Sequence, residues 1–280
     1  MKIGVIGSGI MGNGIAQVFA MGGFEVVLLD VNQEALTKAQ QMVSKSLDKL
    51  SKKKELQVDE VLNRITFTTN KNSLKDTELV IEAVTENIEA KKAVFKELDE
   101  ICDQKTILAS NTSSLTISEI ASATDRRDRV CGLHFFNPVP LMKLVEVVAA
   151  EETSAETIKI VEKLVSKINK ESIHVKDNPL FVVNRLLVPL ICEAISLVDE
   201  GTATPEDIDK GMMLGANFPI GPLSLADMIG LDTMLHIQEA LFIKTGDPKY
   251  RVPELLRKMV EAGELGRKSG KGFYQYNKHL

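Results

Sequence analysis

The chain has 280 residues and a formal net charge of −5 at pH 7, with 44% hydrophobic and 26% charged residues. This length allows one large domain or two ordinary ones, and the composition is that of a globular protein with a sizeable core. The net negative charge argues against general nucleic-acid binding, which needs a basic surface. The three cysteines, Cys102, Cys131 and Cys192, form no closely spaced pair. We therefore expect neither a disulfide framework nor a metal site.

No targeting or membrane-spanning segment is expected. The first residues, MKIGVIGSG, have the pattern of a buried strand rather than that of a signal peptide. The most apolar stretch, residues 186–198, is interrupted by Pro189 and Glu193 and is too short to span a membrane. These features predict a cytoplasmic protein with no membrane partner.

The first part of the chain alternates short apolar runs with helical patterns. Several runs are continuously apolar, which is typical of strands covered on both faces. Strands are expected at residues 2–6, 25–29, 79–83, 106–110, 130–135 and 143–149, and helices at 12–21, 33–50 and 88–102. This βαβ rhythm predicts an α/β fold with a Rossmann-type, doubly wound, mostly parallel sheet.

The pattern changes after about residue 178, because no further strand pattern follows. Residues 181–199 have the pattern of one long apolar helix with a kink at Pro189. Another helix is expected to begin with Thr204 as N-cap and Pro205 as its first residue. We therefore predict two domains, an α/β domain at 1–180 and an all-helical C-terminal domain at 181–280.

The strongest motif is a glycine-rich loop that directly follows the first expected strand and opens a helix. It consists of Gly7, Ser8, Gly9, Ile10, Met11 and Gly12. Gly7 permits a tight turn, Gly9 lets the backbone approach a pyrophosphate, and Gly12 lets helix and strand pack closely. The helix N-terminus attracts the negative charge. We interpret the loop as a dinucleotide site; the alternative is a glycine-rich turn of some other α/β protein.

Asp30 ends the second expected strand, about twenty residues after Gly7, where the ribose-binding acid of such sites lies. A carboxylate there accepts hydrogen bonds from the ribose hydroxyls and would repel a 2′-phosphate. The following residues, Val31-Asn32-Gln33, supply no arginine for that phosphate. The sequence therefore favours NAD over NADP.

Five lysines gather near the end of the helix expected at 33–50, namely Lys45, Lys49, Lys52, Lys53 and Lys54. Three of them, Lys45, Lys49 and Lys53, would share one stripe if the helix continues to Lys53. Such a stripe is commonly a solvated face. Local positive charge on an acidic protein can also attract a polyphosphate. The lysines alone leave both interpretations open.

Two ionisable residues lie within apolar strand sequences. Glu146 has apolar neighbours at i±2, Leu144 and Val148, which argues against a solvated strand face. A buried carboxylate needs a charged or hydrogen-bonding partner. His134 ends another apolar strand and could be a satisfied core histidine or a catalytic base. A nearby carboxylate favours catalysis, because it would orient the ring and stabilise the imidazolium.

Polar residues follow the strand expected at 106–110. The segment Asn111-Thr112-Ser113-Ser114 could cap a helix that starts near Ile117 or contact a ligand, since ligands of open α/β sheets bind beyond the carboxyl ends of strands. Asn184 is the uncharged polar residue in the run 181–187, near the domain boundary. Its amide could bond within its own helix or reach a bound ligand.

Several separated motifs follow one another along the chain. They are the glycine loop, EAVTEN at 82–87, SNTSSL at 110–115, HFFNPVPLM at 134–142, Asn178-Pro179 with FVVNR at 181–185, Gly221-Pro222, and GRKSGKGFY at 266–274. Together they resemble the L-3-hydroxyacyl-CoA dehydrogenase family, above all its bacterial members that act on 3-hydroxybutyryl-CoA. The resemblance extends from Lys2 to Tyr276, essentially the whole chain.

The resemblance implies an NAD-dependent dehydrogenase that interconverts a short-chain L-3-hydroxyacyl-CoA, such as 3-hydroxybutyryl-CoA, and its 3-ketoacyl-CoA, such as acetoacetyl-CoA. It implies that His134 is the catalytic residue, paired with Glu146. Ser113 and Asn184 would hold the substrate oxygen. The implied NAD contacts are the glycine loop, Asp30, Glu86, Lys91, Ser113, Asn137 and Lys268. The implied CoA contacts are Ser46, Lys49, Lys53 and neighbouring lysines. A homodimer formed largely through the helical domain is also implied.

Two other functions are compatible with parts of this pattern. A dehydrogenase of the same two-domain design could act on a free 3-hydroxy acid, and it would not need the lysine stripe. An NAD-binding structural or sensor protein would not need the complete set of Ser113, His134, Glu146 and Asn184.

Overall fold

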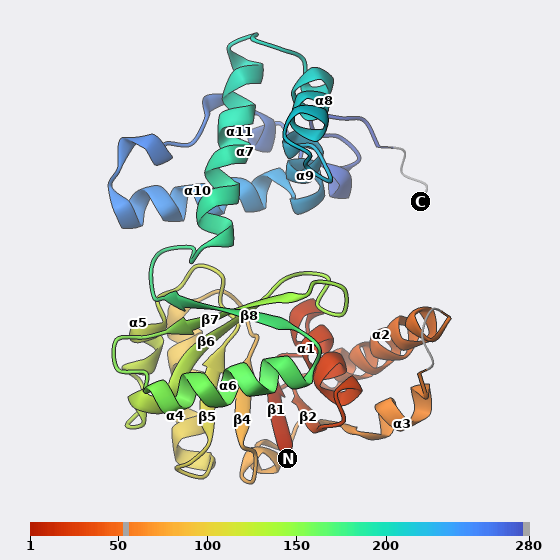
Figure 1. Ribbon diagram of the computed structural model, residues 1–280, viewed down its shortest axis with the longest axis vertical. Helices are drawn as coiled ribbons and strands as arrows, with labels where there is room; N and C mark the ends of the chain where they lie inside the picture. The colour runs from red at the N-terminus through yellow and green to blue at the C-terminus, as the bar shows by residue number, and fades with distance from the viewer. Residues whose placement is uncertain (53–55, 277–280) are drawn as a thin grey trace. The chain divides into compact units, whose positions relative to one another are not determined.

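The computed structural model describes residues 1–52 and 56–276. The chain packs into two compact units, Met1–Phe181 and Val182–Leu280. Figure 1 shows the strands of the first unit as one twisted layer with helices against it, and a second unit built from helices. Within the described residues, no helix is both long and apolar enough to cross a membrane.

The first unit is organised around one sheet of eight strands in the order β3-β2-β1-β4-β5-β6-β7-β8. The strands are β1 (Lys2–Ile6), β2 (Glu25–Leu29), β3 (Ile65–Thr68), β4 (Leu79–Glu82), β5 (Ile107–Ser110), β6 (Val130–Phe135), β7 (Leu144–Ala149) and β8 (Glu171–Lys176). All neighbouring pairs are parallel except β6 and β7. The predicted doubly wound, mostly parallel sheet is confirmed.

Helices cover both faces of this sheet. They are α1 (Ile10–Met21), α2 (Gln33–Ser51), α3 (Val58–Asn63), η1 (Lys71–Leu74), α4 (Ile88–Ile101), α5 (Ile117–Ala121), η2 (Arg127–Arg129) and α6 (Ala155–Lys167). The helices α1, α2, α3 and α6 pack into the hydrophobic cluster of one face, and α4 and α5 into that of the other. Successive strand residues alternate between the two clusters, as Leu79 and Val80 do, because side chains of a strand point to opposite faces.

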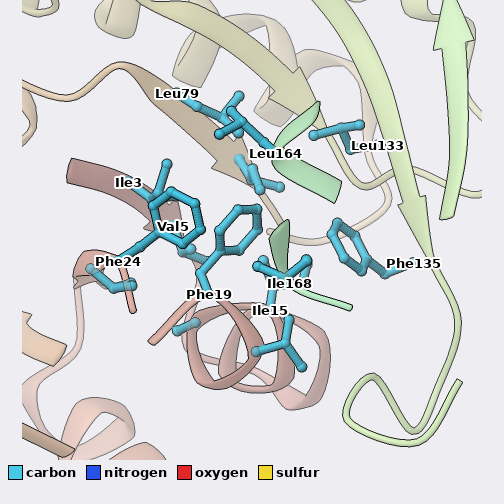
Figure 2. Packing of buried hydrophobic residues seen from close by; sticks show 14 of the residues in the cluster. Ile3, Val5, Ile15, Phe19, Phe24, Leu79, Leu133, Phe135, Leu164 and Ile168 are labelled. Carbon is cyan, nitrogen blue, oxygen red and sulfur yellow. The ribbon is translucent and has the colours of Figure 1, made fainter. Parts of the chain in front are cut away.

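Phe19 of α1 lies at the centre of the first cluster (Figure 2). Its ring packs edge-on against Phe24 at a centroid distance of 5.6 Å and against Phe135 at 6.4 Å. Phe135 is the last residue of β6. The helix that opens with the glycine loop and the strand that carries His134 are therefore joined by one continuous packed core.

The second unit is helical throughout the part that the structure describes, apart from two isolated bridges near its end. Its helices are α7 (Val183–Asp199), α8 (Pro205–Gly215), α9 (Pro222–Ile229), α10 (Leu231–Thr245), η3 (Pro248–Tyr250), α11 (Glu254–Glu261) and η4 (Arg267–Ser269). Pro189 lies inside α7, and Thr204 caps α8 by accepting a hydrogen bond from the Asp207 amide. The expectation of an all-helical C-terminal part is confirmed.

Two buried carboxylates anchor the end of the second unit. Asp227 accepts hydrogen bonds from the amides of Phe273 and Tyr274 and from the Tyr276 hydroxyl, each at 3.0 Å. Asp209 accepts one from the Tyr274 hydroxyl at 2.8 Å. These contacts hold the last described segment, which carries the GRKSGKGFY motif, against the helices.

Two strands and two α-helices of the first unit were not predicted, and neither were the short 3-10 helices η1 and η2. The strand β8 has the sequence ESIHVK and is mostly exposed, so it lacks the apolar run that identified the other strands. The strand β3 is only four residues long. The helices α3 and α6 were also missed, although α6 places Ile158, Val161 and Leu164 on one buried face at helical spacing.

We predict that Phe19→Ala lowers the free energy of unfolding by about 3–5 kcal/mol, because it leaves a cavity in a close-packed core. Urea unfolding of the whole chain measures the change. Lys163→Ala, at an exposed position of α6, is the matched control and should stay within about 0.5 kcal/mol of the unsubstituted protein. Equal effects of the two substitutions would contradict the central role of Phe19.

Candidate active site

The polar motifs of the first unit converge on one edge of the sheet. The strands β1, β2, β4, β5 and β6 run in the same direction, so their carboxyl ends lie along that edge. Ligands of open α/β sheets bind beyond such an edge, where the strand order reverses. Here the order reverses between β1 and β4, which the glycine loop and the EAVTEN segment respectively follow.

The three glycines of the loop lie in different structural surroundings. Gly7 has a φ of +95°, and a Cβ there would lie 2.6 Å from the carbonyl oxygen of Ala83. A Cβ on Gly12 would lie 1.7 Å from the carbonyl oxygen of Gly7. A Cβ on Gly9 would meet no atom within 4 Å. Gly7 and Gly12 are thus required by the fold, whereas Gly9 borders open space at the N-terminus of α1, which has no side-chain cap. This arrangement fits a bound phosphate group.

Asp30 lies at the end of β2 and is oriented by the same loop. Its Oδ2 accepts hydrogen bonds from the amide and the hydroxyl of Ser8, both at 2.7 Å, and its Oδ1 accepts one from the Asn32 amide at 3.0 Å. Burial raises the pKa of Asp30, but the hydrogen bonds from Ser8 and Asn32 outweigh it and leave the pKa below its usual value. The carboxylate is therefore ionised at neutral pH and partly exposed, as a ribose ligand must be.

An apolar cavity of about 240 Å³ lies beside Gly7 and Asp30. Its lining includes Ile6, Leu29, Val84 and Leu98. The cavity has no signature in the sequence, because its walls come from strands and helices far apart in the chain. A planar apolar group attached to the ribose would fit there.

His134 and Glu146 lie directly opposite each other in the antiparallel pair β6–β7. The His134 Nδ1 and the Glu146 Oε2 are 2.6 Å apart, and the two side chains are 7% and 0% exposed. The solvated-face alternative for Glu146 is therefore wrong. The rings of Phe136 and Phe181 pack against the imidazole at centroid distances of 4.5 and 5.6 Å. With Nδ1 held by the carboxylate, Nε2 is the nitrogen that can exchange a proton with a substrate.

The segment 111–114 folds around the carboxylate of Glu86. The Glu86 Oε1 accepts hydrogen bonds from the amides of Ser113 and Ser114 at 3.0 and 3.1 Å, and from the Thr112 hydroxyl at 2.5 Å. The helix α5 is capped instead by Asp177, which accepts from the amides of residues 117 and 118. The capping alternative for the segment 111–114 is therefore wrong.

A further hydrogen bond joins this segment to the strand β6. The Asn111 Oδ1 accepts a hydrogen bond from the amide of Phe135 at 2.9 Å, which ties the segment to the end of β6 next to His134. Burial raises the pKa of Glu86, but the Lys91 charge and the hydrogen bonds from Thr112, Ser113 and Ser114 leave it below its usual value. Glu86 is thus a carboxylate that organises the chain around Ser113.

Lys91 lies inside the fold and contacts the carboxylate of Glu86. Its side chain is 1% exposed and its ammonium lies 2.7 Å from the Oε1 of Glu82 and 3.4 Å from the Oε2 of Glu86. Sequence analysis did not identify Glu82, which is completely buried at the end of β4. A glutamate that ends the apolar run Leu79–Ile81 was the signal that could have singled it out, by the argument used for Glu146.

The lysine stripe is placed only in part. The helix α2 ends at Ser51, and Lys53 and Lys54 lie outside the described residues. Lys45 and Lys49 are exposed and one turn apart, and Ser46 between them is half-buried.

The remaining expected contacts come from three separate elements. Asn137 is exposed in the loop after β6, and Lys170 supports that loop by donating hydrogen bonds to the carbonyls of Val139 and Met142. In the second unit, Asn184 is the second residue of α7, and Lys268 pairs with Asp232. Among the residues that the structure describes, no group of three or more His, Cys, Asp or Glu side chains is arranged to hold a metal ion.

Comparison with known proteins agrees with this geometry. Residues 2–178 match the model of the 3-hydroxyacyl-CoA dehydrogenase NAD binding domain, and residues 181–276 match that of the 3-hydroxyacyl-CoA dehydrogenase C-terminal domain. The chain belongs to the 3-hydroxyacyl-CoA dehydrogenase family. It is therefore an oxidoreductase of a family that uses NAD, and its glycine loop lies within the matched NAD-binding domain.

Individual members of the family are similar over their whole length. A 3-hydroxybutyryl-CoA dehydrogenase of Clostridioides difficile is 51% identical over 99% of this chain and 100% of that protein. A probable 3-hydroxybutyryl-CoA dehydrogenase of Deinococcus radiodurans is 52% identical over 99% of this chain and 100% of its own length. The crystal structure of (S)-3-hydroxybutyryl-CoA dehydrogenase from Ralstonia eutropha matches with a TM-score of 0.96 and 50% identity, covering 99% of both chains.

Gly9 and Gly12 of this family member give a matched pair of substitutions. We predict that Gly12→Ala destabilises the protein by about 3 kcal/mol, because its Cβ meets backbone. Gly9→Ala should cost at most about 1 kcal/mol, the usual loss at an N-cap. It should nevertheless weaken NADH binding about tenfold or more, since a lost charge-assisted hydrogen bond costs about 1.5–3 kcal/mol. Thermal unfolding and fluorescence titration with NADH separate the two effects. Unchanged NADH affinity in Gly9→Ala would contradict the assignment of this loop.

Proposed function

We propose that this chain catalyses the NAD-dependent interconversion of (S)-3-hydroxybutyryl-CoA and acetoacetyl-CoA. The observation that carries the proposal is the buried His134–Glu146 pair, at 2.6 Å, on the edge of the sheet where the glycine loop also lies. The names of the full-length relatives at about half identity supply the substrate class.

His134 is proposed to move the proton of the reaction. In the oxidative direction its Nε2 takes the proton of the 3-hydroxyl group, and in the reductive direction it returns that proton to the 3-keto oxygen. Bound NAD supplies the acceptor, or NADH the donor, of the hydride at C3. Glu146 keeps the ring in one orientation and stabilises the imidazolium that forms, because it is a buried carboxylate in direct contact with Nδ1.

Ser113 and Asn184 are proposed to hold the oxygen at C3 near His134. The position of Ser113 is set by Glu86, whose carboxylate accepts the Ser113 amide. Orienting the reacting oxygen contributes to the rate because the bound substrate then lies close to its reactive geometry. Two neutral donors suit an oxygen that changes between hydroxyl and carbonyl during the reaction.

The contacts of the cofactor and of the CoA handle are proposed as follows. The NAD contacts are Gly7, Ser8, Gly9, Ile10, Met11, Gly12, Asp30, Glu86, Lys91, Ser113, Asn137 and Lys268. Ser46, Lys49 and Lys53 would bind the phosphates of CoA. The exposed positions of Lys45 and Lys49 on one side of α2 support a polyphosphate contact there.

We also propose a homodimer in the cytoplasm that binds neither nucleic acid nor membrane. The second unit exposes large apolar side chains, with Leu186 70%, Leu214 77% and Ile243 80% exposed. Apolar surface of this kind is typical of subunit interfaces. Sedimentation equilibrium should give twice the chain mass, and a monomer at micromolar concentration would contradict the dimer.

The decisive experiment is the oxidation of NADH with acetoacetyl-CoA, with NADPH and free acetoacetate as parallel alternatives. Fast turnover of the thioester with NADH alone is expected. Comparable turnover with NADPH would contradict the role of Asp30. Turnover of free acetoacetate would favour a free-acid dehydrogenase, and no turnover with any pair would favour the non-catalytic alternative.

We predict that His134→Gln lowers kcat by about 10²–10⁴-fold, the usual contribution of a positioned general base. NADH affinity should be retained, because the substituted ring lies on β6 and not in the glycine loop. Stopped-flow turnover and fluorescence titration measure the two quantities on the same sample. An undiminished kcat would refute the role of His134.

We predict that Lys49→Glu raises the KM for acetoacetyl-CoA about three- to tenfold, as expected when roughly 1 kcal/mol of exposed ion pairing is lost. Its kcat should change little, since the lysine is not at the reacting carbon. Lys163→Glu makes the same charge change on another helix and should leave the KM unaltered. A KM that shifts equally in both variants would mean that net charge, rather than a local CoA contact, is responsible.

A further inference from the structure

A chain of three charged side chains, of which Glu82 and Lys91 are buried and Glu86 is partly exposed, leads to the segment that carries Ser113. It begins at Glu82, the last residue of β4, which lies next to Ser110 of β5 in the parallel register. Ser110 in turn pairs with Gly132 of β6, two residues before His134. Side chains of a strand alternate between faces, so the residue in register with Gly132 lies on the same sheet face as His134. The charges therefore lie on that face, one step inside the edge where the substrate is proposed to bind.

Glu82 is fully engaged by three donors. Its Oε1 accepts hydrogen bonds from the Val84 amide at 2.6 Å and from the Lys91 ammonium at 2.7 Å. Its Oε2 accepts one from the Ser110 hydroxyl at 2.7 Å. The side chain is 0% exposed, so it touches neither solvent nor a substrate outside the fold. Any effect of Glu82 on the reaction must pass through its partners.

Lys91 connects Glu82 to Glu86. Its ammonium is buried between the two carboxylates, 2.7 Å from the first and 3.4 Å from the second. It also lies 3.4 Å from the Val84 carbonyl oxygen. Desolvating an ammonium is costly, and the nearby carboxylates offset that cost. The relative attraction of the Glu82 and Glu86 carboxylates thus determines how close the Lys91 ammonium lies to Glu86.

Glu86 links the position of the Lys91 ammonium to the segment 112–114. Its Oε2 faces Lys91. Its Oε1 accepts hydrogen bonds from the amides of Ser113 and Ser114 and from the hydroxyls of Thr112 and Ser114. One rigid carboxylate group therefore has the buried cation on one oxygen and the segment 112–114 on the other. A shift of the ammonium towards Glu86 moves or reorients the acceptor of the Ser113 amide.

We propose that Glu82 is a positioning residue for the dehydrogenase reaction, acting through Lys91 and Glu86 on Ser113; this rests on the function proposed above. Glu82 holds the Lys91 ammonium inside the fold, so that Glu86 keeps its Oε1 for the amides of the segment 112–114. Without the Glu82 charge, Glu86 becomes the nearest carboxylate for a buried cation. The Ser113 hydroxyl then loses the fixed position from which it holds the substrate oxygen.

The central experiment is a double-mutant cycle of Glu82→Gln with Ser113→Ala, measured as kcat with acetoacetyl-CoA and NADH. Glu82→Gln alone should lower kcat by about 10–100-fold, because a misplaced catalytic contact costs up to about 10² in rate. In the Ser113→Ala background the same substitution should cost less than about threefold, since groups that act as one unit are not additive. An equal loss in both backgrounds would overturn the proposal.

Asp99→Asn is the matched control. Asp99 pairs with Arg126, whose side chain is 3% exposed, so this substitution also breaks a buried ion pair of the first unit. Arg126 further donates to backbone carbonyls at the end of α4, on the opposite side from the segment 112–114. Asp99→Asn should lower the thermal midpoint but leave kcat within about twofold. A kcat loss like that of Glu82→Gln would mean that general destabilisation explains the effect and would overturn the proposal.

Hydrogen exchange gives a readout that does not depend on turnover. The amides of Ser113 and Ser114, bonded to Glu86, should exchange faster in Glu82→Gln, while the amides of β6 keep their protection. Unchanged exchange would overturn the proposal even if kcat falls. If the unsubstituted protein shows no turnover, the proposed function fails and exchange alone decides the positioning role. Glu82→Asp, which keeps the charge one methylene further back, carries the same measurements if Glu82→Gln does not fold.

Discussion

The antiparallel pairing of β6 and β7 is the constraint on which the candidate site depends. In an otherwise parallel sheet, this one reversal places Glu146 directly across from His134 with both side chains on one face. The pair is buried, so the carboxylate has no water to compete with the ring, and the contact at 2.6 Å fixes which nitrogen remains for a substrate. Phe135 packs against Phe19 and so connects β6, which carries His134, to the helix that follows the glycine loop. The proposed proton-transfer residue and the proposed cofactor loop therefore rest on one hydrophobic core.

Two groups of buried charges lie near the candidate site, and in each of them the charged side chains have hydrogen-bonding partners. Glu146 is matched by His134, and Lys91 by Glu82 and Glu86, with further donors from Val84 and Ser110 on the remaining carboxylate positions. A half-satisfied group of this kind would be worse than an apolar core, because an unpaired buried ion loses its hydration without compensation. Such groups rigidify the strand ends from which the loops of the candidate site emerge. They also explain why polar residues occur where the sequence otherwise demands apolar ones.

Much of the site could be inferred from local sequence, and the reasons are specific. Gly7 and Gly12 stand where only a glycine fits, and Asp30 ends the strand that follows, so motif and spacing together led to the dinucleotide loop. Glu146 stood out because its strand neighbours are apolar. Glu82 was overlooked although its run is just as apolar, since it lies at the strand end where a polar residue is ordinary. The strand β8 was missed because an exposed edge strand carries no apolar run. The alternative that Asn111–Ser114 caps a helix could not be decided locally, because the actual cap, Asp177, lies about sixty residues away.

The sequence by itself determined the α/β class of the first part, the helical character of the second, the glycine loop and, through its ordered motifs, the family. These features depend on hydrophobic period, on backbone conformations open only to glycine and on residues close in the chain. The resemblance implied that His134 is paired with Glu146, and the tertiary structure added the strand register that places them opposite each other. Only the tertiary structure decided that Glu86 gathers the segment around Ser113 and that Lys91 is buried between two carboxylates. The contacts of Glu86 with the segment around Ser113 join residues 26 to 28 apart in sequence, whereas the His134–Glu146 and Lys91–Glu82 contacts join consecutive elements and span 12 and 9 residues. Their geometry follows from sheet register and core packing, which no local pattern encodes.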